Sequence, residues 1–75
     1  MPRLPGFTYR QFVKKLKQLG FAFDRQARGS HEIWFHPVKK RAVTVPRHSG
    51  KTFKKGTLRS MIKDSGFPVS QFSKG

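Results

Sequence analysis

The chain has 75 residues and no cysteine, so it forms one small domain with a thin core and has neither disulfides nor thiolate metal sites. Its 17 Lys and Arg residues against three Asp and Glu residues give a formal net charge of +14, which attracts polyanions. No apolar run approaches the roughly 20 residues that span a bilayer, and the N-terminus lacks a signal-peptide pattern, so we expect a cytoplasmic protein.

A first helix is predicted over residues 8–19. Thr8 and Gln11 have the spacing of a capping box, in which each side chain bonds the backbone N–H of the other residue. An apolar stripe at helical spacing follows, made of Phe12, Leu16 and Leu19. Gly20 lies where a glycine commonly ends a helix. The helix therefore has one face to bury and a solvated face rich in lysine.

Three strands and a second helix follow. Turn residues separate short segments in which apolar side chains alternate with polar ones, a pattern typical of strands. The predicted strands cover residues 21–26, 31–36 and 41–46. After a charged loop, a second helix is predicted from Lys55 or Thr57 to Ser65. The chain ends, residues 1–6 and 70–75, are expected to be flexible parts of this single domain.

The order α-β-β-β-α predicts an α+β domain in which two helices cover one face of a three-stranded antiparallel sheet. Strand alternation predicts that the helices bury Phe21, Phe23, Ile33, Phe35, Val43 and Val45. His31 shares this face but begins its strand, where the helix cover runs out. Trp34 is then expected on the open face, together with Glu32 and His36.

A basic turn at the start of the second strand carries the clearest chemistry, in Gly29, Ser30 and His31. An imidazole exchanges a proton near neutral pH. In metal-free RNA cleavage, a base removes the proton from a ribose 2′-hydroxyl, which then attacks the adjacent phosphate. Gly29 allows close approach of a substrate backbone, and Ser30 with the turn amides is suited to bind a phosphate oxygen. The alternative is a histidine that only hydrogen-bonds at the strand end.

The other two histidines are less informative. His48 follows the third strand, whose end neighbours the start of the second strand in an antiparallel pair. It is therefore either a second acid or phosphate contact near His31 or an ordinary loop residue. His36, at the far end of its strand, is interpreted as structural. The His, Asp and Glu residues are scattered without metal-ligand spacing, so no metal site is predicted.

Basic residues also gather at the start of the second helix. Free backbone amides and the positive end of the helix dipole make such a place a candidate anion site, although a solvated basic loop is the alternative. The cations concerned are Lys51, Lys54, Lys55 and Arg59. Trp34 has three interpretations that stay open: it stacks an RNA base, it docks a protein partner, or it covers the bare sheet.

In combination these motifs are similar to those of a known family. The chain resembles the HicA toxins of bacterial toxin–antitoxin systems in Gly29-Ser30-His31, Ile33, Phe35, Val43-Thr44-Val45-Pro46-Arg47-His48, Gly50-Lys51 and Lys54-Lys55-Gly56-Thr57-Leu58-Arg59. The resemblance implies a fold like the double-stranded-RNA-binding domain and a ribonuclease, independent of metal and cofactor, that cuts messenger RNA and halts translation. It implies that the motif histidine, here His31, is catalytic. It also implies a HicB-type antitoxin that masks the active site.

The first hypothesis is therefore a HicA-like mRNA endoribonuclease toxin with His31 as general acid or base. Its RNA-binding residues would be Arg28, Gly29, Ser30, Trp34, Arg47, His48, Lys51, Lys54, Lys55 and Arg59. A second hypothesis is a basic RNA- or DNA-binding module of the same fold without catalysis. A third is a protein-interaction module whose charge serves an acidic partner.

Overall fold

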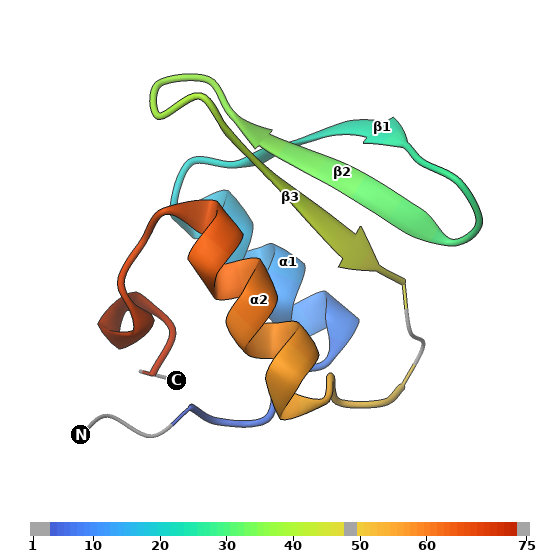
Figure 1. Cartoon of the computed structure of the whole chain (residues 1–75), viewed down its shortest axis with the longest axis vertical. Helices are drawn as coiled ribbons and strands as arrows, with labels where there is room; N and C mark the ends of the chain where they lie inside the picture. Colours follow the sequence, from blue (N-terminus) through green and yellow to red (C-terminus); the bar gives the residue numbers. More distant parts are fainter. Residues whose placement is uncertain (1–3, 48–49, 74–75) are drawn as a thin grey trace.

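The predicted element order is confirmed by the structure, a computed structural model that describes residues 4–47 and 50–73. Its elements are α1 (Tyr9–Gln18), β1 (Ala22–Gln26), β2 (His31–His36), β3 (Arg41–Pro46), α2 (Lys55–Ser65) and a short 3₁₀ helix, η1 (Val69–Gln71). The strands form one antiparallel sheet in the order β1-β2-β3, and both helices lie on the same side of it (Figure 1). In this described part, neither helix has the length and apolarity needed to cross a bilayer.

The ends of α1 follow from local sequence. The Thr8 hydroxyl accepts from the Gln11 N–H at 3.3 Å, and the Gln11 side chain accepts from the Thr8 N–H at 3.0 Å, so the capping box is confirmed. After the helix, Gly20 adopts a positive φ of 103°. A Cβ atom at Gly20 would lie 2.7 Å from Nε2 of His36, so glycine is required there both by conformation and by space.

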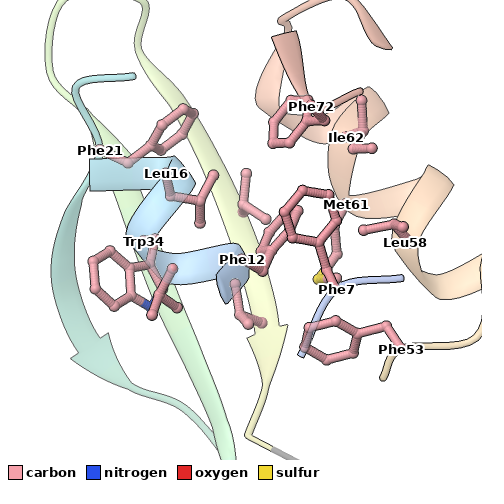
Figure 2. Close-up of a cluster of buried hydrophobic side chains, with 13 residues drawn as sticks. Phe7, Phe12, Leu16, Phe21, Trp34, Phe53, Leu58, Met61, Ile62 and Phe72 are labelled. Carbon is pink, nitrogen blue, oxygen red and sulfur yellow. The ribbon is translucent and has the colours of Figure 1, made fainter. Parts of the chain in front are cut away.

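The core lies between the sheet and the two helices (Figure 2). Phe12 of α1 is fully buried, and its ring lies edge-on to the rings of Phe7 and Phe53 at centroid distances of 5.8 and 5.9 Å. From α2, Leu58, Met61 and Ile62 are buried as their helical spacing predicts. The ring contacts of Phe12 bring together Phe7, in the segment before α1, and Phe53, in the segment before α2. The same two segments are joined by a backbone hydrogen bond, in which the Phe53 N–H donates to the Phe7 carbonyl at 2.8 Å.

The C-terminal end, predicted to be flexible over residues 70–75, packs on the core in its described part. The 3₁₀ helix η1 turns the chain back, and Phe72 is fully buried, stacked on Phe12 with a centroid distance of 5.6 Å. A core this thin gains much from one more aromatic ring, and burial of that ring offsets the entropy lost by ordering the tail.

The predicted faces of β2 are reversed in the structure. Glu32, Trp34 and His36 are buried against the helices, whereas Ile33 and Phe35 are half-buried on the open face. The helix side tolerates the polar residues because their polar atoms are paired. His36 is held by the Leu19 carbonyl at 3.0 Å from Nε2, and by the Lys39 N–H, which donates to Nδ1 at 3.0 Å. His36 is thus structural, as interpreted, but on the other face.

The remaining predictions of burial are mixed. Phe21, Val43 and Val45 are buried as expected. Phe23 is 51% exposed, which corrects its predicted place in the core. It pairs with Trp34 across the sheet and touches the edge of that ring at a centroid distance of 5.9 Å. Because β1 is an edge strand with an irregular register just after Phe23, this side chain lies at the rim of the helix cover.

Candidate functional site

The β1–β2 turn holds His31 at the start of β2. The Ala27 N–H donates to the His31 carbonyl at 2.8 Å, and the Gln26 side-chain amide donates to the carbonyls of Gly29 and His31 at 3.3 and 3.2 Å. Gly29 has a positive φ of 67°, and a Cβ atom built there would meet open space. The turn therefore has a supported backbone with room beside Gly29 for a ligand.

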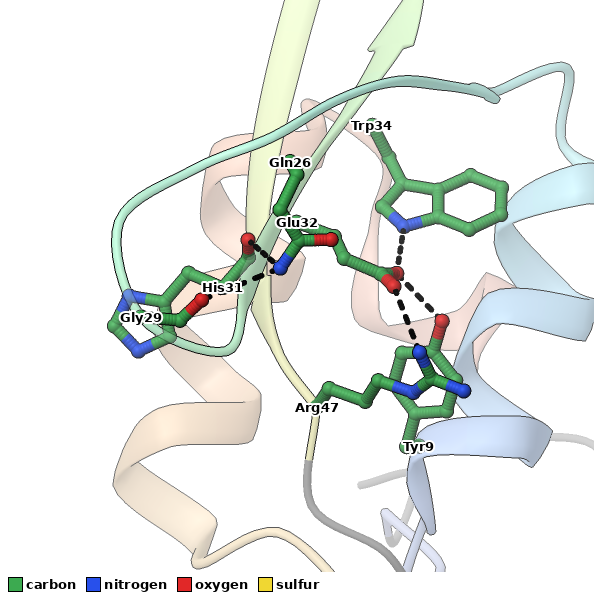
Figure 3. A network of polar contacts seen from close by, with 7 residues as sticks. All are labelled: Tyr9, Gln26, Gly29, His31, Glu32, Trp34 and Arg47. Atoms are coloured by element: carbon green, nitrogen blue, oxygen red, sulfur yellow. Dashed lines mark hydrogen bonds and ion pairs between the residues drawn. The ribbon is translucent and has the colours of Figure 1, made fainter.

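The His31 side chain is exposed and lies on the open face of the sheet (Figure 3). It points to the side of β2 opposite to Trp34, because successive side chains of a strand alternate between faces. Arg28 and Ser30, the two predicted phosphate contacts beside it, are exposed as well. The structure therefore places Arg28, Gly29, Ser30 and His31 together in one accessible turn.

The backbone of Arg47 lies beside this turn, whereas its side chain points away from it. The Arg47 N–H donates to the Ser30 carbonyl at 2.9 Å, next to the pair formed by His31 and Pro46. The guanidinium is on the helix side, with Cζ 5.6 Å from the centre of the Tyr9 ring. Arg47, predicted as an RNA-binding residue, thus adjoins the His31 turn through its main chain, whereas its charged group lies on the other face.

A buried carboxylate organises that other face. Glu32 is 5% exposed, and its Oε1 accepts from the Tyr9 hydroxyl at 2.5 Å and from Trp34 Nε1 at 3.1 Å. Oε2 of Glu32 lies 4.0 Å from Nη1 of Arg47 (Figure 3). Two donors and one cation thereby compensate a negative charge that would be costly to bury alone.

Burial, the hydrogen bond to Glu32 and the negative charge of Glu32 together raise the pKa of Tyr9 to about 12 from 10.0, and the nearby Arg47 opposes them. Because the folded-state pKa is the higher one, the protonated phenol stabilises the fold below pH 10, and this contribution is lost as pH rises toward 12. Tyr9 is the only tyrosine of the chain, so its ionisation can be followed alone by absorbance.

We expect the absorbance of ionised Tyr9 to appear with a midpoint near pH 12 in the folded protein. In Glu32→Gln the midpoint should fall below that of the wild type, because the carboxylate charge is gone, and should stay above 10.0, because burial remains. Circular dichroism at each pH shows whether the protein is still folded. A wild-type midpoint at 10 in folded protein would contradict the network.

An open cleft of about 850 Å³ lies between α1, Trp34 and the end of β3. We name it the α1 cleft, and its lining includes Tyr9, Arg10, Lys14, Lys17, Trp34 and Arg47. Arg10, Lys14 and Lys17 were not among the predicted site residues. Their spacing of four and three residues already places them on one helix face, and this was the available signal.

The structure corrects the predicted exposure of Trp34 on the open face, on which its interpretation as a stacking platform for an RNA base depended. Trp34 is 4% exposed, belongs to the core and has the Lys17 ammonium 5.7 Å from its ring centre. The open face is instead formed by the side chains that alternate with it, Ile33 and Phe35. A base therefore has no free indole face to stack on.

The second predicted group of cations lies around the start of α2. Lys51, Lys54, Lys55 and Arg59 are all exposed. Lys54 occupies the N-cap position without a side-chain cap. Lys51 and Lys54 belong to the β3–α2 connection, and Lys55 and Arg59 belong to the start of α2. His48 lies outside the described residues, and among the described ones no group of three or more His, Asp and Glu side chains could hold a metal ion.

One comparison with known proteins matches most of the chain. The family model for the HicA toxin of bacterial toxin–antitoxin systems matches residues 9–67, which run from the first residue of α1 to just beyond α2. A search of curated proteins found no match. Because the matched region covers most of the chain and includes the Gly-Ser-His turn, the chain belongs to the HicA toxin family, and it is a toxin that acts together with an antitoxin partner.

Proposed function

We propose that this toxin is a metal-independent endoribonuclease that cleaves messenger RNA in the cytoplasm and inhibits translation, and that a HicB-type antitoxin restrains it. The observation that carries the proposal is the exposure of His31 in the turn that also presents Arg28, Gly29 and Ser30. This turn lies within the region matched by the toxin family. The net charge of +14 favours a polyanionic substrate.

The proposed reaction needs one proton removed and one supplied. The His31 imidazole takes the proton of the ribose 2′-hydroxyl, and the 2′-oxygen forms a new bond to phosphorus. The bond from phosphorus to the 5′-oxygen of the next nucleotide breaks, and that oxygen takes up a proton from solvent water as it leaves, while the imidazolium returns its proton to the solvent. Arg28 and Ser30 hold the phosphate during this exchange. The products are a 2′,3′-cyclic phosphate and a 5′-hydroxyl end.

The test is incubation of a long unstructured RNA with the purified protein in excess EDTA. We expect cleavage that co-elutes with the protein on size exclusion, with 2′,3′-cyclic phosphate ends on the products. Activity that disappears in EDTA and returns with a divalent ion would refute the metal-independent mechanism. RNA that stays intact with and without added metals would refute the nuclease itself.

A non-catalytic RNA-binding module is the second candidate, because the α1 cleft gathers four cations on the face opposite His31. It predicts salt-sensitive RNA binding without strand scission. Binding alone does not separate the two candidates, since both require it. Analysis of the RNA ends does.

A further inference from the structure

We propose that the α1 cleft binds the phosphate backbone of the RNA, as a contact additional to the His31 turn. The inference rests on the proposed function only in naming RNA as the ligand, and it does not require cleavage. The cleft lies on the helix-covered side of the sheet and the His31 side chain on the open side, so the two would hold different stretches of one strand.

The cations of the cleft form a row. Arg10, Lys14 and Lys17 are exposed and separated by about 6 and 4.5 Å along the helix axis, at 1.5 Å per residue. Arg47 also lines the cleft, with its Cζ 5.6 Å from the centre of the Tyr9 ring. A linear array of positive charges suits a ligand with regularly repeated negative charges, as in a nucleic-acid strand.

Within the part of the chain that the structure describes, none of the residues lining the cleft is acidic, so no negative charge among them opposes such a ligand. The nearby Glu32 is buried behind Tyr9 and Trp34, and both of its oxygens face donors or a cation. The Tyr9 phenol is uncharged at neutral pH, as a tyrosine ordinarily is, and its pKa, raised to about 12, keeps it uncharged at higher pH as well.

The cleft is suited to phosphates and not to bases. Trp34 is only 4% exposed and has Lys17 over one face of its ring, and Arg47 lies over one face of the Tyr9 ring, so the cleft offers a base little aromatic surface for stacking. Contacts to phosphate position a strand without reading its sequence. We therefore expect the contribution of the cleft to be the same for RNAs of different sequence.

The backbone of Arg47 connects the cleft to the His31 turn. Its N–H is bonded to the Ser30 carbonyl at 2.9 Å, and its side chain lines the cleft. A strand whose phosphate lies at Ser30 can therefore pass around the end of β3 into the cleft. This continuity favours RNA over an acidic protein segment as the occupant, because the same strand would already be held at His31.

The test compares two double variants in a His31→Ala background, which prevents cleavage during binding. Lys14→Ala with Lys17→Ala removes two cations of the cleft. Lys40→Gly with Lys63→Ala removes two exposed cations elsewhere and leaves the same net charge. Affinity for a labelled single-stranded 20-nucleotide RNA is measured by fluorescence anisotropy over a series of salt concentrations, after checking that thermal midpoints agree.

We expect the cleft variant to lose about tenfold in affinity at low salt. The slope of log affinity against log salt concentration should become shallower by about 1.4, because each of the two lost phosphate contacts contributes about 0.7 to that slope. The control should lose about twofold or less. Trp34, the only tryptophan, lines the cleft, so its emission in the His31→Ala parent should change on saturation with RNA.

Equal weakening in both variants would overturn the inference, because it would show a general effect of charge. An unchanged Trp34 emission at saturation would overturn it as well. If poly-glutamate perturbs Trp34 and RNA does not, the occupant is an acidic protein and the inference is wrong. Since every protein here carries His31→Ala, failure of the nuclease proposal does not affect these outcomes.

Discussion

Replacing His31 with alanine is expected to reduce the rate of RNA cleavage by about 10²–10⁴-fold, the range typical of a lost general acid or base. The imidazole is exposed at the rim of the open face, so its removal opens no cavity in the core. The free energy of unfolding should change by no more than about 0.5 kcal/mol. Loss of activity without loss of stability is the signature of a catalytic residue in this position.

The measurement uses initial rates of RNA cleavage in EDTA, with the variant purified in parallel to the wild type. Thr44→Ala is the matched control, because Thr44 is an exposed residue of β3 whose side chain lies on the same face as that of His31. It should cleave within about twofold of the wild type, as expected of a surface substitution. Equal rates for the wild type and His31→Ala would remove His31 from the mechanism.

Phe72→Ala is expected to lower the free energy of unfolding by about 3–5 kcal/mol, the usual cost of removing a buried aromatic ring. Phe72 is fully buried, stacked on Phe12 and edge-on to Phe7 at a centroid distance of 6.4 Å. A domain of 75 residues has a total stability of about 4–11 kcal/mol. The single substitution of Phe72, seven positions beyond the end of α2, therefore removes a large share of the stability.

Thermal unfolding followed by circular dichroism measures this effect. A loss of about 1 kcal/mol lowers the midpoint of a domain of this size by at least about 4 °C, so a loss of about 3 kcal/mol should lower it by at least about 12 °C. Phe23→Ala is the control of the same residue type, since Phe23 is 51% exposed, and it should cost about 1 kcal/mol. If both variants unfold at the same temperature, the C-terminal segment does not belong to the core.

The boundaries of the elements could be predicted from local sequence. The Thr8–Gln11 capping box and Gly20 determine where α1 begins and ends, because both act through hydrogen bonds and backbone angles within a few residues. The bounds of β2, β3 and α2 agree with prediction for the same reason. The candidate catalytic turn was found in this way too, since Gly29, Ser30 and His31 are contiguous.

The choice of buried face could not be predicted from alternation. Ile33 and Phe35 are more apolar as a set than Glu32, Trp34 and His36, and hydrophobicity alone favours burying them. What decides the matter is pairing with distant residues: Glu32 meets the hydroxyl of Tyr9, 23 positions away, and His36 meets the carbonyl of Leu19, 17 positions away. Strand alternation is symmetric, so only such long-range partners identify the covered side.

The distinction between local patterns and long-range contacts applies to the candidate site as well. By itself, the sequence determined that a basic domain presents His31 in a glycine-containing turn, because these features depend on composition and on neighbouring residues. Only the tertiary structure placed the Arg47 charge on the face opposite His31 and joined it to Arg10, Lys14 and Lys17 in the α1 cleft. The cleft exists because α1 packs across β2, and a contact between elements that lie far apart in the chain leaves no local pattern in the sequence.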